Sequence, residues 1–172
     1  LRGSLIQRYK TIWNHDYWIQ YGPWLAAPRD PFIFEAPSKI MVRQTGDSLI
    51  ATLVGQKFIA RNNLHIVLPK DLQYDIRYIL GIINSKLLDF VYTLINPEKG
   101  EALAEVKKHH VEQLPILPIN FDNPQEHACH DRMVALVEKM LTLQKQHAAV
   151  KTPHEKDNLQ RQIDATDRQI DK

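Results

Sequence analysis

The sequence predicts an α+β fold, in which a small antiparallel or mixed sheet packs with helices and a helical hairpin follows at the C-terminal end. Three observations lead to it: short β-branched runs divided by turn signals between positions 39 and 68, helical spacing of apolar residues from position 72, and two helix-start signatures after position 122. The chain has 172 residues, 44% hydrophobic and 24% charged, and can bury a core without disulfide bonds. We expect one domain over residues 1–118 and the hairpin, a coiled-coil-like scaffold, over residues 119–172.

Residues 1–37 are rich in aromatic and proline side chains and contain all three tryptophans of the chain. Each proline removes a backbone donor and restricts the residue before it, so a long helix is excluded here. We expect short strands joined by rigid loops. The aromatic side chains could stack on flipped bases, although at this density such side chains more often fix the core and the loops. The prolines are Pro23, Pro28, Pro31 and Pro37.

A meander of strands is predicted next. Residues 39–45 alternate in the manner of a strand, Gly46-Asp47 signals a turn, and residues 48–54 form a second strand. Gly55-Gln56 turns the chain again. Shorter strands follow over residues 57–60 and 64–68, before Pro69.

The hydrophobic period then changes from that of a strand to that of a helix. Asn84-Ser85 can cap a new helix in the middle of this segment, so we expect two helices that meet at a corner. A loop over residues 96–100 and a polar, helix-compatible run over 101–110 follow. Residues 114–119 indicate an edge strand, because they include two prolines. The apolar positions with helical spacing are Leu72, Ile76, Ile79, Leu80, Ile83, Leu87, Val91 and Leu94.

Two helix-start signatures mark the hairpin. Asn123-Pro124 with Glu126, and Thr152-Pro153 with Glu155, each combine an N-cap residue, a proline at the first helical position and an early glutamate. Each helix has a narrow apolar stripe, which suits packing on another helix, either the sister helix or a second chain. The stripes are Met133, Leu136, Met140 and Leu143, and Leu159, Ile163, Thr166 and Ile170.

Several classes of protein are excluded by what the sequence lacks. A single cysteine, Cys129, excludes a disulfide framework and a cysteine-rich zinc module. The sequence has no apolar run of membrane-span length, no signal-peptide pattern, no phosphate-binding glycine loop, no Gly-x-Ser-x-Gly and no His-Glu-x-x-His. The chain begins at Leu1 rather than at Met and stops at Lys172 inside a helical pattern, so we expect a fragment of a larger soluble intracellular protein.

Two groups of residues invite a metal interpretation. His127, Cys129 and His130 do not converge on one side of a helix, which predicts a helix surface with two histidines and a small buried thiol. Glu105-Val106-Lys107, with Asp89 upstream, has the spacing of a metal-dependent nuclease. That chemistry needs the glutamate on a strand, whereas this segment is predicted as helix or loop. We therefore expect no catalytic residue and no metal site in the chain.

The positive charge is concentrated in the first third of the chain. The formal net charge is +2, yet residues 1–70 hold 9 Lys and Arg against 4 Asp and Glu, whereas residues 119–172 hold 8 against 9. An anionic partner would therefore bind the first third. Arginine and lysine suit guanine edges and phosphates, and asparagine and glutamine suit adenine. Base recognition and an ordinary charged strand face are equally good interpretations of these residues: Lys39, Arg43, Gln44, Lys57, Arg61, Asn62 and Asn63.

Six stretches in sequence order resemble the TaqI-like C-terminal specificity domain. They span nearly the whole chain, and their order is more specific than any one of them. The stretches are Leu1-Arg2-Gly3 with Ile6-Gln7-Arg8-Tyr9; Tyr21-Gly22-Pro23-Trp24-Leu25 with Pro28-Arg29-Asp30-Pro31 and Phe34; Lys39-Ile40-Met41-Val42-Arg43-Gln44; residues 79–88 with Gly81, Asn84, Ser85 and Lys86; Val111-Glu112-Gln113-Leu114-Pro115-Ile116; and residues 162–171.

The resemblance implies a target-recognition domain at the C-terminal side of an adenine-N6 DNA methyltransferase, of the kind found in restriction–modification systems and fused restriction enzymes. Such a methyltransferase carries an Asn-Pro-Pro-Tyr/Phe motif and binds S-adenosylmethionine. Asn96-Pro97 and Asn123-Pro124 do not continue in that way, so catalysis is expected in a part of the parent outside this chain. S-adenosylmethionine, and Mg²⁺ if a nuclease is fused, belong to that part. Because Leu1 falls inside the family's pattern, we expect the domain to start before it.

From the resemblance we expect double-stranded DNA as the partner, a prokaryotic cytoplasmic location, contact with the methyltransferase domain of the same polypeptide, and a homodimer if the C-terminal helices pair between chains. The domain would dock in a DNA groove beside the adenine that the methyltransferase flips out. The loop after residue 96 would add phosphate contacts through Lys99, Lys107 and Lys108. Two alternatives remain: a helical protein–protein interaction module, and a metal-dependent nuclease domain.

Overall fold

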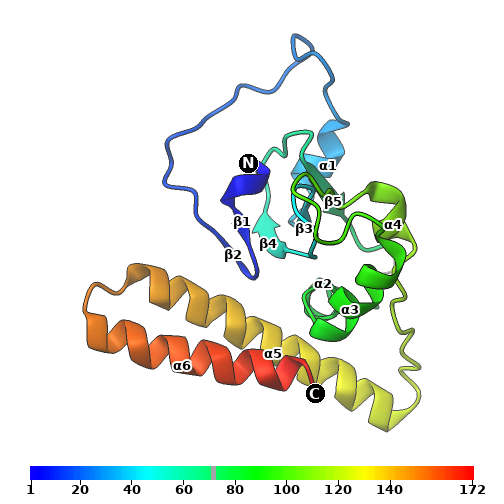
Figure 1. Cartoon of the computed structure of the whole chain (residues 1–172), viewed down its shortest axis with the longest axis vertical. Helices are drawn as coiled ribbons and strands as arrows, with labels where there is room; N and C mark the ends of the chain where they lie inside the picture. Colours follow the sequence, from blue (N-terminus) through cyan, green and yellow to red (C-terminus); the bar gives the residue numbers. More distant parts are fainter. Residues whose placement is uncertain (71–72) are drawn as a thin grey trace.

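The computed structural model describes residues 1–70 and 73–172 and confirms the α+β class, with the elements arranged as in Figure 1. The predicted helical position Leu72 lies outside the described residues. In chain order the elements are η1 (Gly3–Leu5), β1 (Ile6–Gln7), β2 (Lys10–Thr11), α1 (Pro31–Glu35), β3 (Ser38–Arg43), β4 (Ala51–Gly55), β5 (Leu64–Val67), α2 (Ile76–Ile83), α3 (Lys86–Ile95), α4 (Lys108–Glu112), α5 (Pro124–Ala149) and α6 (Pro153–Ile170).

The main sheet has the strand order β4-β3-β5 and is antiparallel throughout. Met41 lies opposite Thr52 of β4 and opposite Ile66 of β5. The predicted meander is therefore wrong in its pairing, because β5 lies beside β3 and not beside β4. The outer edge of β4 is occupied by other groups, because Ala51 O accepts a hydrogen bond from Tyr9 N (3.0 Å) and from the Asn84 side chain (3.0 Å). The predicted strand over residues 57–60 is a turn and loop.

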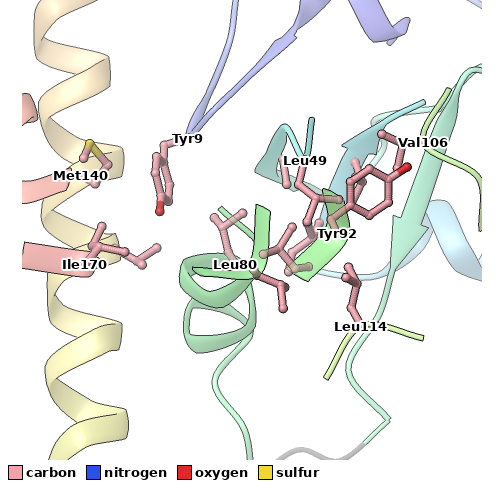
Figure 2. Packing of buried hydrophobic residues seen from close by; sticks show 14 of the residues in the cluster. Tyr9, Leu49, Leu80, Tyr92, Val106, Leu114, Met140 and Ile170 are labelled. Atoms are coloured by element: carbon pink, nitrogen blue, oxygen red, sulfur yellow. The ribbon is translucent and has the colours of Figure 1, made fainter. Parts of the chain in front are cut away.

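The central strand β3 is covered on both faces, so its side chains alternate between two clusters. Ile40 and Val42 belong to the main cluster, which includes residues of α2, α3, α5 and α6. Met41 belongs to a second cluster with Phe34 of α1, on the opposite face of the sheet. Figure 2 shows part of the main cluster, where Tyr9 lies among side chains of the helices.

Helices α2 and α3 meet at the predicted corner. Ser85 is the N-cap of α3, and its Oγ accepts a hydrogen bond from Leu88 N (3.1 Å). The two helices are bent by 62°. This bend changes which face of α3 is inward, so Leu87 and Leu94 are 73% and 70% exposed and Tyr92 is buried instead. No single described helix is long and apolar enough to cross a membrane, while α2 and α3 together pass that test by length and composition only.

The hairpin forms as predicted from its start signatures. Asn123 caps α5 by accepting a hydrogen bond from Gln125 N (3.0 Å). The two helices run side by side in Figure 1 and are in contact, so their stripes pack on the sister helix. α5 also packs closely on α2, because a Cβ at Gly81 would lie 2.5 Å from Met133 Sδ. The buried positions of the pair are His130, Val137, Met140, Leu143, Ile163, Thr166 and Ile170.

Two other local predictions differ from the structure. Residues 114–119 form no strand; they follow an irregular path, with Leu117 O accepting a hydrogen bond from Tyr78 Oη (3.1 Å). Only the end of the 101–110 run becomes helical, as part of α4. In the first stretch, β1 and β2 are short as expected, and Asp30 caps an additional short helix, α1.

Candidate nucleic-acid interface

The end of β3 and the turn before β5 lie side by side because those strands pair. We call this region the β3–β5 corner and define it as Arg43, Gln44, Arg61, Asn62 and Asn63. Gln44 N donates to Asn63 O (3.1 Å). Gly3 packs between the two segments, and a Cβ there would lie 3.5 Å from Arg43 Cγ and 3.1 Å from Asn63 O. The structure therefore brings five of the predicted residues together.

The polar groups of the corner differ in their freedom to bind a ligand. Arg61 and Asn62 are exposed. Arg43 is half-buried and its Nε donates to Thr45 Oγ1 (3.0 Å), which orients the guanidinium without neutralising it. Gln44 Nε2 donates to Glu105 Oε2 (3.2 Å), and Asn63 Oδ1 accepts from the backbone of Gly3 (3.2 Å).

Lys39 lies inside the fold. It is 0% exposed, and its ammonium donates to Phe34 O (3.1 Å) and Gly55 O (2.9 Å). Burial lowers the pKa of Lys39. With these bonds Lys39 joins the end of α1 to the end of β4, and its side chain has no exposed surface for a phosphate. Lys57, in contrast, is exposed at the turn after β4, where its backbone has a left-handed φ of 68°.

The three lysines of the later loop are already paired with carboxylates. Lys99 lies 3.9 Å from Asp89, Lys108 lies 3.3 Å from Glu112, and Lys107 pairs with Glu98. The hydrogen bond from Lys107 lowers the pKa of Glu98. A phosphate would have to displace these partners. The positive electrostatic potential at this loop is therefore lower than the number of its lysines suggests. DNA contact by Lys99, Lys107 and Lys108 stays a prediction.

Two arginines outside the predicted set lie close to the corner. Arg29 Nη2 donates to Leu64 O (3.1 Å) and lies 3.4 Å from Arg61 O. The guanidinium of Arg2 lies over the ring of Tyr17, 4.5 Å from its centroid. Together with Lys57 and Arg61 they form a group that we call the rim cations: Arg2, Arg29, Lys57 and Arg61. Within residues 1–70 and 73–172 none of the four has a carboxylate partner.

Sequence reasoning missed Arg2 and Arg29 because neither belongs to a basic run. Arg2 stands among apolar and small residues at the start of the chain, and Arg29 stands between Pro28 and Asp30. A signal was nevertheless present, since both occur inside the motifs that resemble the specificity domain.

The residues of the nuclease interpretation have separate structural roles. Glu105 forms an isolated β-bridge with Thr45 and accepts a hydrogen bond from Gln44. Asp89 accepts from Leu49 N (3.0 Å). In the described part of the chain, no three His, Cys, Asp or Glu side chains lie where they could share a metal ion.

The histidine and cysteine positions of α5 also differ from one another. His130 is buried, and its Nε2 accepts from Asp75 N (3.3 Å). Cys129 is exposed, so the prediction of a buried thiol is wrong.

Comparison with known families gives one match. A model described as the TaqI-like C-terminal specificity domain matches residues 1–116, a range that contains every element from η1 to α4. A comparison with curated proteins found no match.

Proposed function

The chain belongs to the TaqI-like C-terminal specificity domain family, and on that basis we propose that it selects the DNA target of an adenine-N6 methyltransferase whose catalytic domain lies outside these residues. Its role would be recognition rather than chemistry. The duplex would lie against the β3–β5 corner, beside the adenine that the catalytic domain flips out.

One observation supports this placement more than any other: among the described residues, the cations near the corner have no carboxylate partners, whereas those of the later loop do. Arg61 and Asn62 stand exposed on a turn, where arginine can bond a guanine edge bidentately and asparagine can bond an adenine edge. Arg43 is oriented at the end of a buried strand, which makes its position rigid. Rigid placement suits base recognition, because a displaced side chain can no longer form hydrogen bonds of the right geometry with a base edge.

The partners follow from the same proposal. S-adenosylmethionine, and Mg²⁺ where a nuclease is fused, would be bound by the rest of the parent polypeptide in the prokaryotic cytoplasm. Helix α3 presents an apolar stripe of Leu87, Phe90 and Leu94, each at least 60% exposed. Such a stripe suits coverage by another protein surface, which supports contact with the catalytic domain and also the alternative of a protein-interaction module. Pairing of two chains through α5 and α6 stays a prediction. In the structure the two helices of one chain already pack on each other.

The test is selection of bound sequences from a randomised duplex library by the whole chain. We expect the selected duplexes to share a motif. Replacing Arg43 or Arg61 by Ala should then weaken binding to that motif by about 1–3 kcal/mol each and relax the preference at one position. Lys139→Ala, which removes an exposed cation of α5, serves as the control and should leave the affinity unchanged. A library without enrichment, or equal gel-shift affinities for all three variants, would refute the proposal.

A further inference from the structure

A large cavity lies on the face of the sheet away from the helical hairpin. It has a volume of about 950 Å³ and is bordered mainly by two segments, residues 12–30 and the turn over residues 56–62, together with Leu1, Arg2 and Leu5 of the N-terminal segment. We call residues 12–30 the arch, because the segment between β2 and α1 swings wide of the sheet in Figure 1. Phe34 and Ala60, from the second cluster, are part of the lining. Volumes of roughly 300–1,000 Å³ are usual for ligand sites.

The walls of this cavity are aromatic and partly open to solvent. Trp13 packs edge-on against Trp18 (5.2 Å between centroids) and against Phe58 (5.6 Å). Trp18 is nevertheless 80% exposed and Tyr17 is 56% exposed. Isolated exposed aromatic residues are ordinary, but a group of them around one hollow indicates a binding surface. Trp18, the most exposed of them, is accessible to a flat partner.

The lining is positively charged as well as aromatic. All four rim cations line the cavity, and no aspartate or glutamate of the described chain does. The guanidinium of Arg2 lies over Tyr17, and its Nε is buried without a hydrogen-bond partner among the described residues. Arg29 Nη2 donates hydrogen bonds to backbone carbonyls only. A ligand would therefore meet ring faces inside and uncompensated positive charge at the edge.

This combination selects one class of ligand. An apolar peptide would leave the cations unpaired, and a free phosphate would leave the rings uncovered. A nucleotide has a flat base for the rings and a phosphate for the cations. In a paired duplex both faces of each base are covered by its neighbours, so only an unstacked base can enter. We propose that the cavity binds an unstacked base of a DNA strand, with the adjoining phosphates on the rim cations.

The proposal rests on the proposed function only in taking DNA as the ligand. It adds a second site, because the β3–β5 corner would contact paired DNA while the cavity would hold a base that has left the stack. The cost of unstacking would be offset by stacking on the aromatic side chains of the arch.

The arch offers a matched pair of variants. Trp18 donates its indole N–H to His15 O (3.1 Å) and lines the cavity, whereas Trp24 donates to Gln20 O (3.2 Å) and does not. Both are mostly exposed, at 80% and 63%, so alanine at either position should leave the fold intact, as circular dichroism can verify.

The probe is a short single-stranded DNA oligonucleotide that contains one 2-aminopurine, titrated with the whole chain. We expect binding with quenched 2-aminopurine fluorescence. Trp18→Ala should weaken this binding about tenfold and restore the fluorescence, and Trp24→Ala should change neither. Equal binding by Trp18→Ala and the unaltered chain would overturn the proposal, as would the absence of any binding to the single strand.

A second arm separates this proposal from the proposed function. The probe there is the fully paired duplex selected from the library. Arg43→Ala should weaken duplex binding and leave the single strand bound, while Trp18→Ala should do the reverse. Failure of the duplex arm alone refutes the proposed function, and failure of the single-strand arm alone refutes the cavity as a base site. If Trp18→Ala affected only contact with another protein, the cavity would be a protein-docking site and the proposal wrong.

Discussion

Asn84 connects the sheet to the helices through its side chain. It is 3% exposed, and its amide forms two hydrogen bonds with one residue of β4: Ala51 N donates to Oδ1 (3.0 Å), and Nδ2 donates to Ala51 O (3.0 Å). Its backbone oxygen accepts from Arg8 Nη2 (2.6 Å). The sequence predicted Asn84 only as part of a helix cap, whereas the cap is Ser85 and Asn84 holds the edge of β4.

Replacing Asn84 by Leu should destabilise the fold by about 2–3 kcal/mol, because it leaves the buried N–H of Ala51 without a partner. Urea unfolding followed by circular dichroism measures the loss. Ser85→Ala, which removes only the cap, should cost about 1 kcal/mol and serves as the comparison. A loss for Asn84→Leu no greater than that of Ser85→Ala would contradict the assigned role.

Tyr92 makes the stability sensitive to alkaline pH. Its side chain is buried, its hydroxyl donates to Glu105 O (3.3 Å), and burial raises its pKa to about 12. In the unfolded chain the tyrosine pKa is about 10, so the unfolded state loses its proton first as pH rises. The contribution of Tyr92 is therefore complete below about pH 10 and is lost between about pH 10 and pH 12, by about 1.4 kcal/mol per pH unit.

Tyr92→Phe should lower stability by about 1 kcal/mol at neutral pH, where the hydrogen bond is lost, and flatten the decline at alkaline pH. The free energy of unfolding measured at several pH values from about 8 to about 11 checks both effects. Some decline should remain, because burial also raises the pKa of Tyr9 and of Tyr78. An unchanged alkaline slope in Tyr92→Phe would show that its ionisation is not the cause.

At the scale of elements, the hairpin is attached to the rest of the fold by both charge and packing. Arg8 holds Asp167 of α6 with two hydrogen bonds, at 2.8 and 3.2 Å. Asp171 accepts from the backbone N of Lys86 (2.8 Å) and pairs with its ammonium (2.9 Å). Ile163 belongs to the same buried cluster as the central strand. The last helix is therefore fixed both to the turn between β1 and β2 and to the start of α3.

Ile163→Asp should lower the free energy of unfolding by about 3 kcal/mol or more, because it places a charge among buried apolar side chains. Thermal unfolding measures this. Ile163→Val, at a cost of about 1 kcal/mol, keeps the fold and allows the DNA preference to be determined by library selection. If either folded variant selected a different DNA sequence, the hairpin would take part in recognition and the scaffold interpretation would be wrong.

The elements that the sequence predicted correctly are those with local signals. Gly46-Asp47 marks the turn between β3 and β4, and Asn123-Pro124 marks the start of α5. The order of the strands was not predictable in this way. It depends on Tyr9, which is remote from β4 in sequence yet donates to its edge.

The candidate site was predictable in part for the same reason. Charge and residue type located Arg43 and the turn with Arg61, and pairing of β3 with β5 places them together. The burial of Lys39 depends on hydrogen bonds to the carbonyls of Phe34 and Gly55. These bonds cannot be predicted from the distribution of charged residues in the sequence. The position of Arg29 at the cavity depends on the path of the arch, and the hydrophobic periodicity of the sequence does not predict that path.

At the scale of the whole molecule, the net charge of +2 conceals two unlike regions. The cations of the later loop are paired with carboxylates, and residues 119–172 balance 8 Lys and Arg with 9 Asp and Glu, whereas the rim cations have no carboxylate partner among the described residues. The unpaired charge directs a polyanion to the corner and the cavity rather than to the hairpin.

DNA affinity should therefore fall steeply with salt, and a single rim cation should account for a measurable part of the slope. Arg61→Ala should reduce the slope of log K against log salt by about 1, because one fewer counterion is released. Lys139→Ala should leave the slope unaltered. Fluorescence anisotropy titrations at several salt concentrations measure both, and equal slopes for Arg61→Ala and the unaltered chain would place the phosphates elsewhere.

The two-sided burial of β3 has a consequence for how such a domain can diversify. Ile40 and Val42 face the helices, and Met41 faces the second cluster, so one strand insulates the two layers from each other. The arch and the turn over residues 56–62 border only the second layer. Exchange of those two segments should therefore leave the packing of α2, α3, α5 and α6 against β3 unchanged, provided that the contact of Tyr21 with Phe34 of α1 is kept. Grafts between relatives should therefore exchange two pieces: the arch with α1, cut in front of β3, and the turn over residues 56–62, cut at the end of β4 and at the start of β5.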